Sequence, residues 1–219
     1  MSWSSESPNS PDTCKNWCES NGSFIKQMPP PSPPAERTPT VDEDVRLMLS
    51  FQQGDVHDFE RLMERHYKSV FNLANRFLSD RSAAEDVAQN VFLQIFRSAA
   101  GYRPTASFTT WLYTITRNAC YSEIRRRGRR PGSLSGEAAG SPHAEARDDL
   151  EQAELQAAVR RAIAALPENQ RMAVILRRYQ ELSYDQIATA MNTSVGAVKA
   201  LLHRAREALK EKLRSFTDR

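Results

Sequence analysis

Four basic residues near the C-terminus have side-chain types and spacing suited to binding DNA. Residues 195–206 carry apolar side chains at helical intervals, and the basic residues lie largely off that apolar face: Lys199, His203, Arg204 and Arg206. Ammonium and guanidinium groups on an exposed helix pair with phosphates and with acceptor atoms on base edges. The alternative is a basic helix face that is merely solvated, since most charge runs on helices are of that kind.

The residues before this helix favour DNA binding. Ser183 followed by Gln186 predicts a capping box at the start of a first helix. A polar turn at 192–194 then breaks the periodicity, so residues 183–206 are predicted to form a helix-turn-helix. Small residues would let its two helices approach closely: Ala188, Gly196 and Ala197.

Aromatic and basic side chains gather in a second segment near the middle of the chain. Aromatic planes provide stacking surfaces for unpaired bases, and guanidinium groups follow the backbone, so this combination suits single-stranded nucleic acid. The single-strand set consists of Trp111, Arg117, Asn118, Tyr121, Arg125 and Arg126. Aromatic residues in such a segment often belong to a hydrophobic core. We expect this of Phe108, whereas Trp111 fits either role.

Helical periodicity predicts the elements that must position both sets. Helices are expected at 42–53, 55–79, 82–99 and 107–127, then from 151 and from Pro167 up to the helix-turn-helix. The third of these helices has an i, i+1, i+4, i+5 pattern that predicts one buried face: Val87, Ala88, Val91, Phe92, Ile95 and Phe96. No alternation typical of strands persists anywhere, so the predicted fold class is all-α.

Composition divides the chain into two helical domains and two other segments. Residues 1–41 are rich in Ser, Pro, Asn and Gly, which predicts a disordered extension. Residues 131–150 have a similar composition with added acid, which predicts a flexible linker. The total charge is +3, yet residues 42–130 hold 14 basic and 11 acidic side chains, and residues 151–219 hold 12 and 8. Two net basic domains are expected if both contact one polyanion.

The sequence argues against several classes of protein. No apolar run is long enough to cross a bilayer and the N-terminus lacks an apolar signal core, so we expect a cytoplasmic protein without membrane insertion. Three cysteines are too few for a disulfide framework, and the pair Cys14 and Cys18 lacks the further ligands that zinc requires. The sequence contains no phosphate-binding glycine loop and no catalytic constellation. We therefore expect no enzymatic activity, no metal and no cofactor.

Several motifs, in order and on both sides of the predicted linker, resemble the bacterial extracytoplasmic-function sigma factors, the two-domain members of the sigma-70 family. The resemblance covers residues 42–130 and 151–215. The motifs are a polymerase-binding helix at 84–97, a promoter-melting segment at 108–118, C-terminal-domain motifs at 166–171 and 182–188, and a recognition helix at 194–199.

This resemblance implies a division of labour between a sigma-2-like and a sigma-4-like domain. The first would bind the clamp helices of the largest RNA polymerase subunit through Asp86, Gln89, Asn90 and Gln94. It would also recognise and melt the minus-ten element with the single-strand set, in which Asn118 matches the position that holds a flipped base. The second would contact the β-subunit flap and read the minus-thirty-five element with Ser194, Lys199, His203, Arg204 and Arg206.

The expected function is promoter recognition and strand opening as a dissociable subunit of bacterial RNA polymerase, under the control of an anti-sigma factor or a stress signal. A stand-alone helix-turn-helix regulator of transcription is the alternative, but it would need neither the polymerase-binding helix nor the single-strand set. An anti-sigma or adaptor protein that binds polymerase without DNA is disfavoured by the basic recognition helix.

Overall fold

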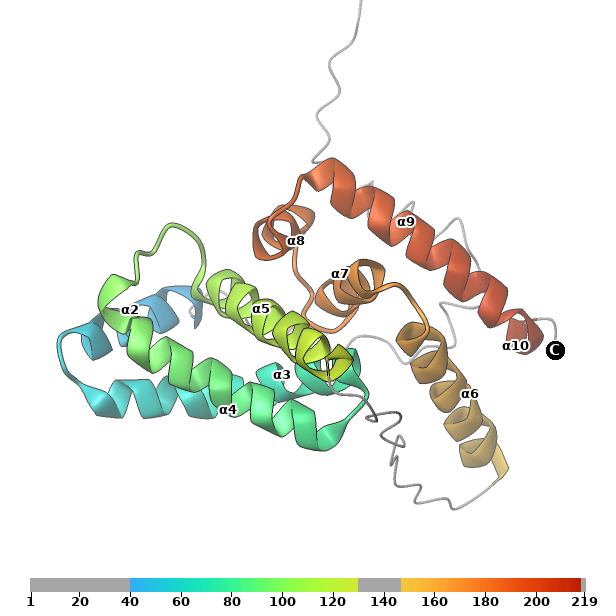
Figure 1. The fold of residues 1–219 in the computed structure, drawn as a ribbon, viewed down its shortest axis with the longest axis horizontal. Coiled ribbons are helices and arrows are strands. Elements are labelled where there is room, and N and C mark those ends of the chain that lie inside the picture. The colour runs from blue at the N-terminus through green and yellow to red at the C-terminus, as the bar shows by residue number, and fades with distance from the viewer. Residues whose placement is uncertain (1–39, 130–146, 218–219) are drawn as a thin grey trace, which may run out of the picture. The chain divides into compact units, whose positions relative to one another are not determined.

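The computed structural model describes residues 40–129 and 147–217, which form helices and no strand (Figure 1). The predicted all-α fold class is confirmed. Most of the predicted disordered extension and most of the predicted linker lie outside the described residues, but Thr40 and Val41, which were assigned to the extension, belong to the first helix. The elements are α2 (Thr40–Gln52), α3 (Val56–Leu78), α4 (Arg81–Ser98), the 3-10 turn η1 (Ala99–Gly101), α5 (Phe108–Gly128), α6 (Arg147–Ala164), α7 (Glu168–Arg178), α8 (Tyr184–Met191), α9 (Val195–Lys212) and α10 (Arg214–Thr217).

Short polar side chains fix where most of these helices begin. An oxygen of each accepts a hydrogen bond from a backbone N–H in the first turn, which would otherwise lack a partner. The residues that cap helices in this way are Asp55, Asp80, Ser107, Ser183 and Ser194. The turn from α2 into α3 uses Gly54 at a φ of 109°, a conformation that other residues rarely adopt.

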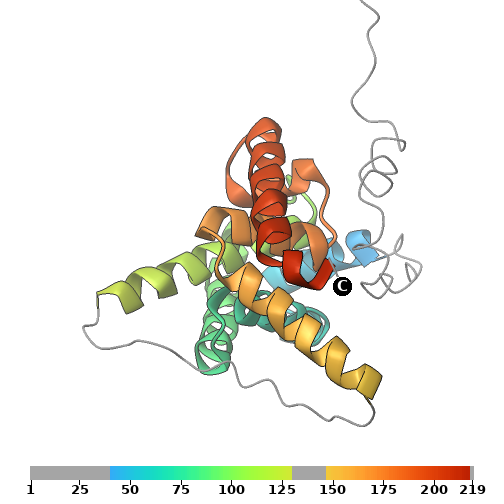
Figure 2. The same cartoon turned by 90° about the vertical axis from the view of Figure 1, so that its right-hand side faces the viewer.

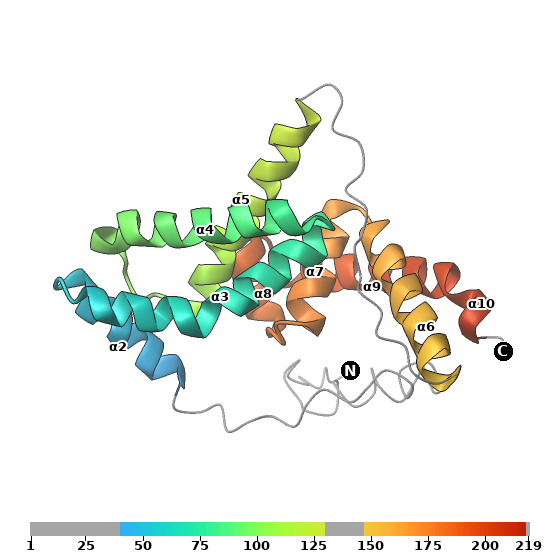
Figure 3. The same ribbon diagram turned by 90° about the horizontal axis from the view of Figure 1, so that it is seen from below.

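Helices α2 to α5 enclose one apolar core. Figure 3 shows α3 and α4 side by side, with the last turns of α5 projecting past them. The side chains of Leu62, Leu73, Phe77, Ile95, Phe108 and Leu112 are almost completely inaccessible to water. Burying each such side chain contributes roughly 1.5–3 kcal/mol, which makes this core the main source of the domain's stability.

A buried carboxylate fastens α2 to α3. Asp44 is 3% exposed, and its two oxygens contact the Nε2 of His66 at 2.9 Å and the NH1 of Arg65 at 3.1 Å. Arg65 also bonds Glu43 at 2.7 Å, which raises the pKa of its guanidinium. Since a buried charge is costly unless it is paired, this network fixes the position of α2 on the bundle.

Helices α6 to α9 form the second block, in which α7 packs against α8 and α9. Figure 2 shows α9, in red, beside the orange α7 and α8. The core of the second block contains Met172, Ile175, Leu176, Ile187, Val198 and Ala205. Helix α6 begins at Arg147, inside the range predicted as linker, and α10 belongs to a separate unit and is a single short turn.

Candidate nucleic-acid interface

The helix-turn-helix forms as the sequence predicted. Ser183 accepts a hydrogen bond from the N–H of Gln186, and the Gln186 side chain accepts one from the N–H of Ser183, so the capping box is complete. Helix α8 ends at Met191, and its C-cap residue Asn192 has a φ of 50°, in the left-handed region that asparagine tolerates. Ser194 then caps α9 by accepting a hydrogen bond from the N–H of Ala197 at 3.1 Å.

The basic residues predicted to read duplex DNA share the outer surface of α9. Lys199, His203 and Arg204 are exposed, and Arg206 is half-buried. The Nε of Arg204 donates to the carbonyl of Ala200 at 3.3 Å, which holds that side chain along the helix. The NH2 nitrogen of the Arg206 guanidinium lies 3.5 Å from the Nδ1 of His203. The predicted set is therefore brought together on one helix, beside the exposed Ser194 at its start.

The role predicted for Gly196 was wrong. Gly196 was expected to permit a close approach of the two helices, but it is exposed. A Cβ added there would meet only the Oγ of Ser194, at the ordinary contact distance of 3.9 Å. The close packing depends instead on Ala188 and Ala190, which are buried in α8.

Helix α5 carries the single-strand set, and its N-terminal half is anchored by aromatic packing. Phe108 is 1% exposed, which confirms the predicted core role. Trp111 is half-buried, with its ring 4.7 Å from that of Tyr102 and 5.8 Å from that of Phe108. One side of Trp111 thus belongs to the core while part of it reaches solvent.

Arg117 connects the two residues that follow it on this surface. Its NH1 donates to the Oδ1 of Asn118 at 3.2 Å, and its guanidinium carbon lies 4.9 Å from the ring centre of Tyr121. A guanidinium only donates hydrogen bonds, so it holds the carbonyl oxygen of the Asn118 carboxamide. The side chain of Asn118 is exposed, and its amide N–H groups are donors that this hydrogen bond does not use.

Tyr121 has contacts that the sequence did not indicate. Its hydroxyl donates to the Oδ1 of Asn169 in α7 at 2.7 Å, and its ring packs 5.3 Å from that of Phe77. Burial raises the pKa of its hydroxyl, so the hydroxyl remains a donor at neutral pH. Nearby, Tyr113 donates to the Oε1 of Gln180 at 2.6 Å.

The arginines at the end of α5 have different partners. The carboxylate of Glu123, 7% exposed, accepts two hydrogen bonds from Arg126, at 2.7 and 2.8 Å, and one from Arg127 at 2.8 Å. Arg127 also donates to Asp80 at 2.8 Å. Hydrogen bonds from Arg126 are the main cause of the lowered pKa of Glu123. Arg125 donates instead to the Oγ of Ser122 at 2.9 Å.

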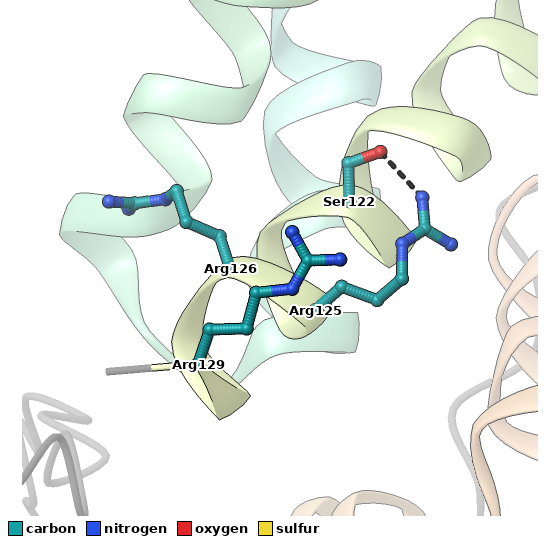
Figure 4. A pocket seen from close by; sticks show the side chains of 4 residues that line it. All are labelled: Ser122, Arg125, Arg126 and Arg129. Carbon is teal, nitrogen blue, oxygen red and sulfur yellow. Dashed lines mark hydrogen bonds between the residues drawn. The ribbon is translucent and has the colours of Figure 1, made fainter. Parts of the chain in front are cut away.

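Figure 4 shows the surface that these side chains form. Ser122, Arg125, Arg126 and Arg129 line an open hollow of about 460 Å³. The guanidinium groups of Arg125 and Arg129 extend on the side of Ser122, whereas Arg126 extends to the other side of the helix. The hollow therefore has a strongly cationic wall.

The polar residues predicted to bind polymerase lie together on α4. Asp86, Gln89, Asn90 and Gln94 are all exposed. The prediction that Phe96 is buried was wrong, because its side chain is 48% exposed and only one side packs, against Phe51 and Phe59. Leu93, which the sequence analysis did not single out, is 51% exposed. An apolar residue on the polar face of a helix was the available signal, since exposed apolar clusters mark binding surfaces.

The described part of the chain has no group of three or more His, Cys, Asp or Glu side chains that could hold a metal ion. None of the described helices combines the length and apolar character needed to span a membrane. Burial raises the pKa of the Cys120 thiol to about 12, which suppresses its reactivity. Cys14 and Cys18 lie outside the described residues.

Comparison with known sequences places both blocks in one group of proteins. Residues 62–130 match the family described as Sigma-70 region 2, and residues 156–209 match Sigma-70, region 4. The chain is 35% identical over 184 residues to the RNA polymerase sigma-H factor of Pseudomonas aeruginosa, covering 80% of this chain and 95% of that protein. It is 33% identical over 186 residues to the ECF RNA polymerase sigma-E factor of Escherichia coli, with 80% and 97% covered.

Two solved structures have a similar arrangement of helices. The structure of CnrH in complex with the cytosolic domain of CnrY has a TM-score of 0.62 at 23% identity, and the match covers 80% of this chain and 99% of that one. The sigma factor RpoE in complex with the anti-sigma factor NepR, from Bartonella quintana, has a TM-score of 0.60 at 25% identity, with 72% and 97% covered.

Proposed function

The chain belongs to the extracytoplasmic-function sigma factors of the sigma-70 family and so directs core RNA polymerase to promoters; we propose that three separate surfaces carry out this work. Each surface contributes binding rather than catalysis, and the protein acts in the cytoplasm beside the chromosome. The stand-alone regulator is not favoured, because relatives of nearly the same length are polymerase subunits.

The first surface is the α4 face, defined as Asp86, Gln89, Asn90, Leu93, Gln94 and Phe96, and its partner is the pair of clamp helices of the largest polymerase subunit. The observation that carries this assignment is the exposure of four polar side chains beside two large apolar ones. Interfaces between proteins have apolar anchors surrounded by polar side chains that fix the orientation of the partner. The α4 face has this composition.

The second surface is the exposed side of α5, and its ligand is the non-template strand of the minus-ten element. The amide N–H groups of Asn118 would donate to a flipped base, and the exposed part of Trp111 would border the pocket. Arg117 orients Asn118 by holding its carbonyl oxygen. Tyr121 contributes its ring to the same surface.

The third surface is the outer side of α9, with duplex DNA of the minus-thirty-five element as its ligand. Lys199, His203 and Arg204 project from the second helix of a helix-turn-helix, the helix that enters the major groove in this motif. Ser194 and Arg206 flank them. We also assign contact with the β-subunit flap to this second block, and control to an anti-sigma factor, because the similar RpoE is described in complex with one.

Transcription in vitro tests the proposal most directly. The purified protein is added to core polymerase on promoters mapped from transcripts that appear on its overexpression. We expect transcription only when both proteins are present, and specific DNA binding only with core enzyme, because the polymerase must fix the spacing of the two DNA-reading blocks. A tight, sequence-specific footprint of the protein alone would support the stand-alone regulator instead.

A further inference from the structure

The described arginines near the end of α5 divide into two pairs with different surroundings. We propose that Ser122, Arg125 and Arg129 form a phosphate cluster that holds the promoter backbone beside the melted segment, whereas Arg126 and Arg127 stabilise the fold. This inference rests on the proposed function, because it names which groups on α5 contact the DNA backbone. It removes Arg126 from the predicted DNA-binding set and adds Ser122 and Arg129.

Arg126 and Arg127 are bound to carboxylates within the domain. The side chain of Glu123 is 8% exposed and accepts both donors of Arg126 in a bidentate pair. Arg127 bridges Glu123 and Asp80, and its own side chain is 27% exposed. Moving either guanidinium to a phosphate would remove part of the pairing of the buried Glu123 carboxylate, which is unfavourable. These two arginines are therefore poor ligands for DNA.

Arg125 and Arg129 differ from this pair in their surroundings. Both are exposed, and among the residues that the structure describes no salt bridge joins either guanidinium to a carboxylate. Arg125 donates a hydrogen bond to the hydroxyl of Ser122, which orients it without neutralising its charge. A guanidinium presents parallel N–H donors that match two phosphate oxygens, and a serine hydroxyl can donate a further hydrogen bond.

The position of the phosphate cluster relative to Asn118 supports this use. Asn118, Ser122, Arg125 and Arg129 are spaced i, i+4, i+7 and i+11, so they form one stripe along the exposed side of α5. At about 1.5 Å of rise per residue, the stripe is about 16 Å long. A DNA backbone that follows the stripe from the base held by Asn118 would pass the phosphate cluster.

The salt dependence of promoter binding tests the assignment. Full-length protein and core polymerase are assembled on a bubble template, which removes the melting step, and the affinity is measured at several salt concentrations. R125Q and R129Q should each lower the slope of log affinity against log salt by about one unit, since each loses one phosphate contact. R126Q should leave the slope unchanged. R160Q, which removes an exposed arginine from α6, is the matched control for lost charge.

Substituting single phosphates by uncharged analogues shows which phosphates the arginines contact. Methylphosphonates are introduced one at a time into the strand around the bubble. We expect the positions that contact Arg125 and Arg129 to weaken binding of the wild-type holoenzyme and to have no further effect in the R125Q/R129Q double variant, because each phosphate and its arginine form one interaction.

Several outcomes would overturn the phosphate cluster. A slope for R125Q/R129Q equal to that of R160Q would do so, as would an equal loss in R126Q. Weaker binding to core polymerase in the absence of DNA would show that the cluster contacts protein. In each case a defective Asn118→Ala variant would leave the proposed function standing, whereas normal transcription by Asn118→Ala as well would count against both.

Discussion

Arg127 near the end of α5 and Asp80 just before α4 are joined by a hydrogen-bonded ion pair of 2.8 Å. Asp80 also accepts the backbone N–H of Ala83 and thereby caps α4. One carboxylate thus begins the helix that carries the α4 face and holds the end of the helix that carries the phosphate cluster. Asp80 gives the two surfaces a fixed mutual position within the first domain.

Removing this carboxylate should cost more stability than removing its arginine partner. Asp80→Ala loses the helix cap and the ion pair together, and we expect a loss of about 1–3 kcal/mol in the free energy of unfolding. Arg127→Gln keeps the cap and should cost about 1 kcal/mol. Urea unfolding of the full chain, followed by circular dichroism, measures both. Equal losses in the two variants would show that the cap contributes nothing.

The stability of the first domain should fall in mild acid. Interactions with Arg126 and Arg127 hold the pKa of Glu123 below its ordinary value of 4.5, and the N–H of Ala83 is the main cause of a pKa for Asp80 below 3.8. Carboxylates with depressed pKa values stabilise the folded state fully above their unfolded pKa and lose that contribution as they become protonated. The melting temperature should therefore decline as the pH falls below about 4.5, and less so in Glu123→Gln. A decline of the same size in Glu123→Gln would contradict this assignment.

The α4 face should tolerate substitution without loss of folding. Leu93→Ala and Phe96→Ala should each weaken binding to core polymerase by about tenfold or more, because buried apolar anchors dominate interface energies. Asp86→Arg combined with Gln89→Ala should abolish association. Co-purification with core polymerase measures the effect, and circular dichroism checks the fold. Val56→Ala provides the control, since Val56 is 52% exposed on α3. Undiminished co-purification of the α4 variants would show that the partner binds elsewhere.

Asn118→Ala should impair open complexes far more than closed complexes, because its base contact exists only after strand separation. Permanganate reactivity reports opening, and gel shifts on duplex and bubble templates report binding. The variant should remain defective on the bubble if Asn118 reads a base. Wild-type opening and transcription on both templates would mean that the base pocket lies elsewhere, in the loop at 100–107.

Lys199→Ala combined with Arg204→Ala should weaken the first docking of the holoenzyme on duplex promoter DNA. Each lost base contact should cost roughly 1–3 kcal/mol, and each lost phosphate contact should lower the salt slope by about one unit. Strand separation, measured by permanganate reactivity once the complex has formed on duplex DNA, should be unaffected. Gel shifts over a range of salt concentrations measure the docking step, and an unchanged affinity would remove these residues from the readout.

Most of the helices could be predicted from sequence because periodicity and capping residues act locally. Ser183 with Gln186 fixed the start of α8, and Asp55, Asp80 and Ser107 lie at the predicted starts of α3, α4 and α5 within one or two residues. The start of α6 differed. Residues 147–150 are helical although their composition resembles that of the preceding segment, because local composition alone does not reveal that a helix extends beyond its apolar pattern.

The site was less predictable, since exposure and pairing depend on distant neighbours. Phe96 continued the apolar pattern of α4, but a periodic pattern does not distinguish a side chain that faces the domain core from one that faces a partner. Arg126 was assigned to DNA as part of a run of arginines. The spacing of Glu123 and Arg126, three residues apart on one helix, could have indicated their pairing. The link from Arg127 to Asp80 spans 47 residues and has no local signal.

Of the described arginines near the end of α5, two are bound to carboxylates and two have no carboxylate partner in the described residues, which has a consequence for how such a protein can diverge. Arg127, Glu123 and Asp80 are joined by ion pairs, so a change in one should lower the stability of the fold until the others change with it. In the described residues, neither Arg125 nor Arg129 forms an ion pair on which the fold depends. Promoter affinity can therefore drift upward or downward at these two positions, one substitution at a time, while the scaffold beneath them stays the same.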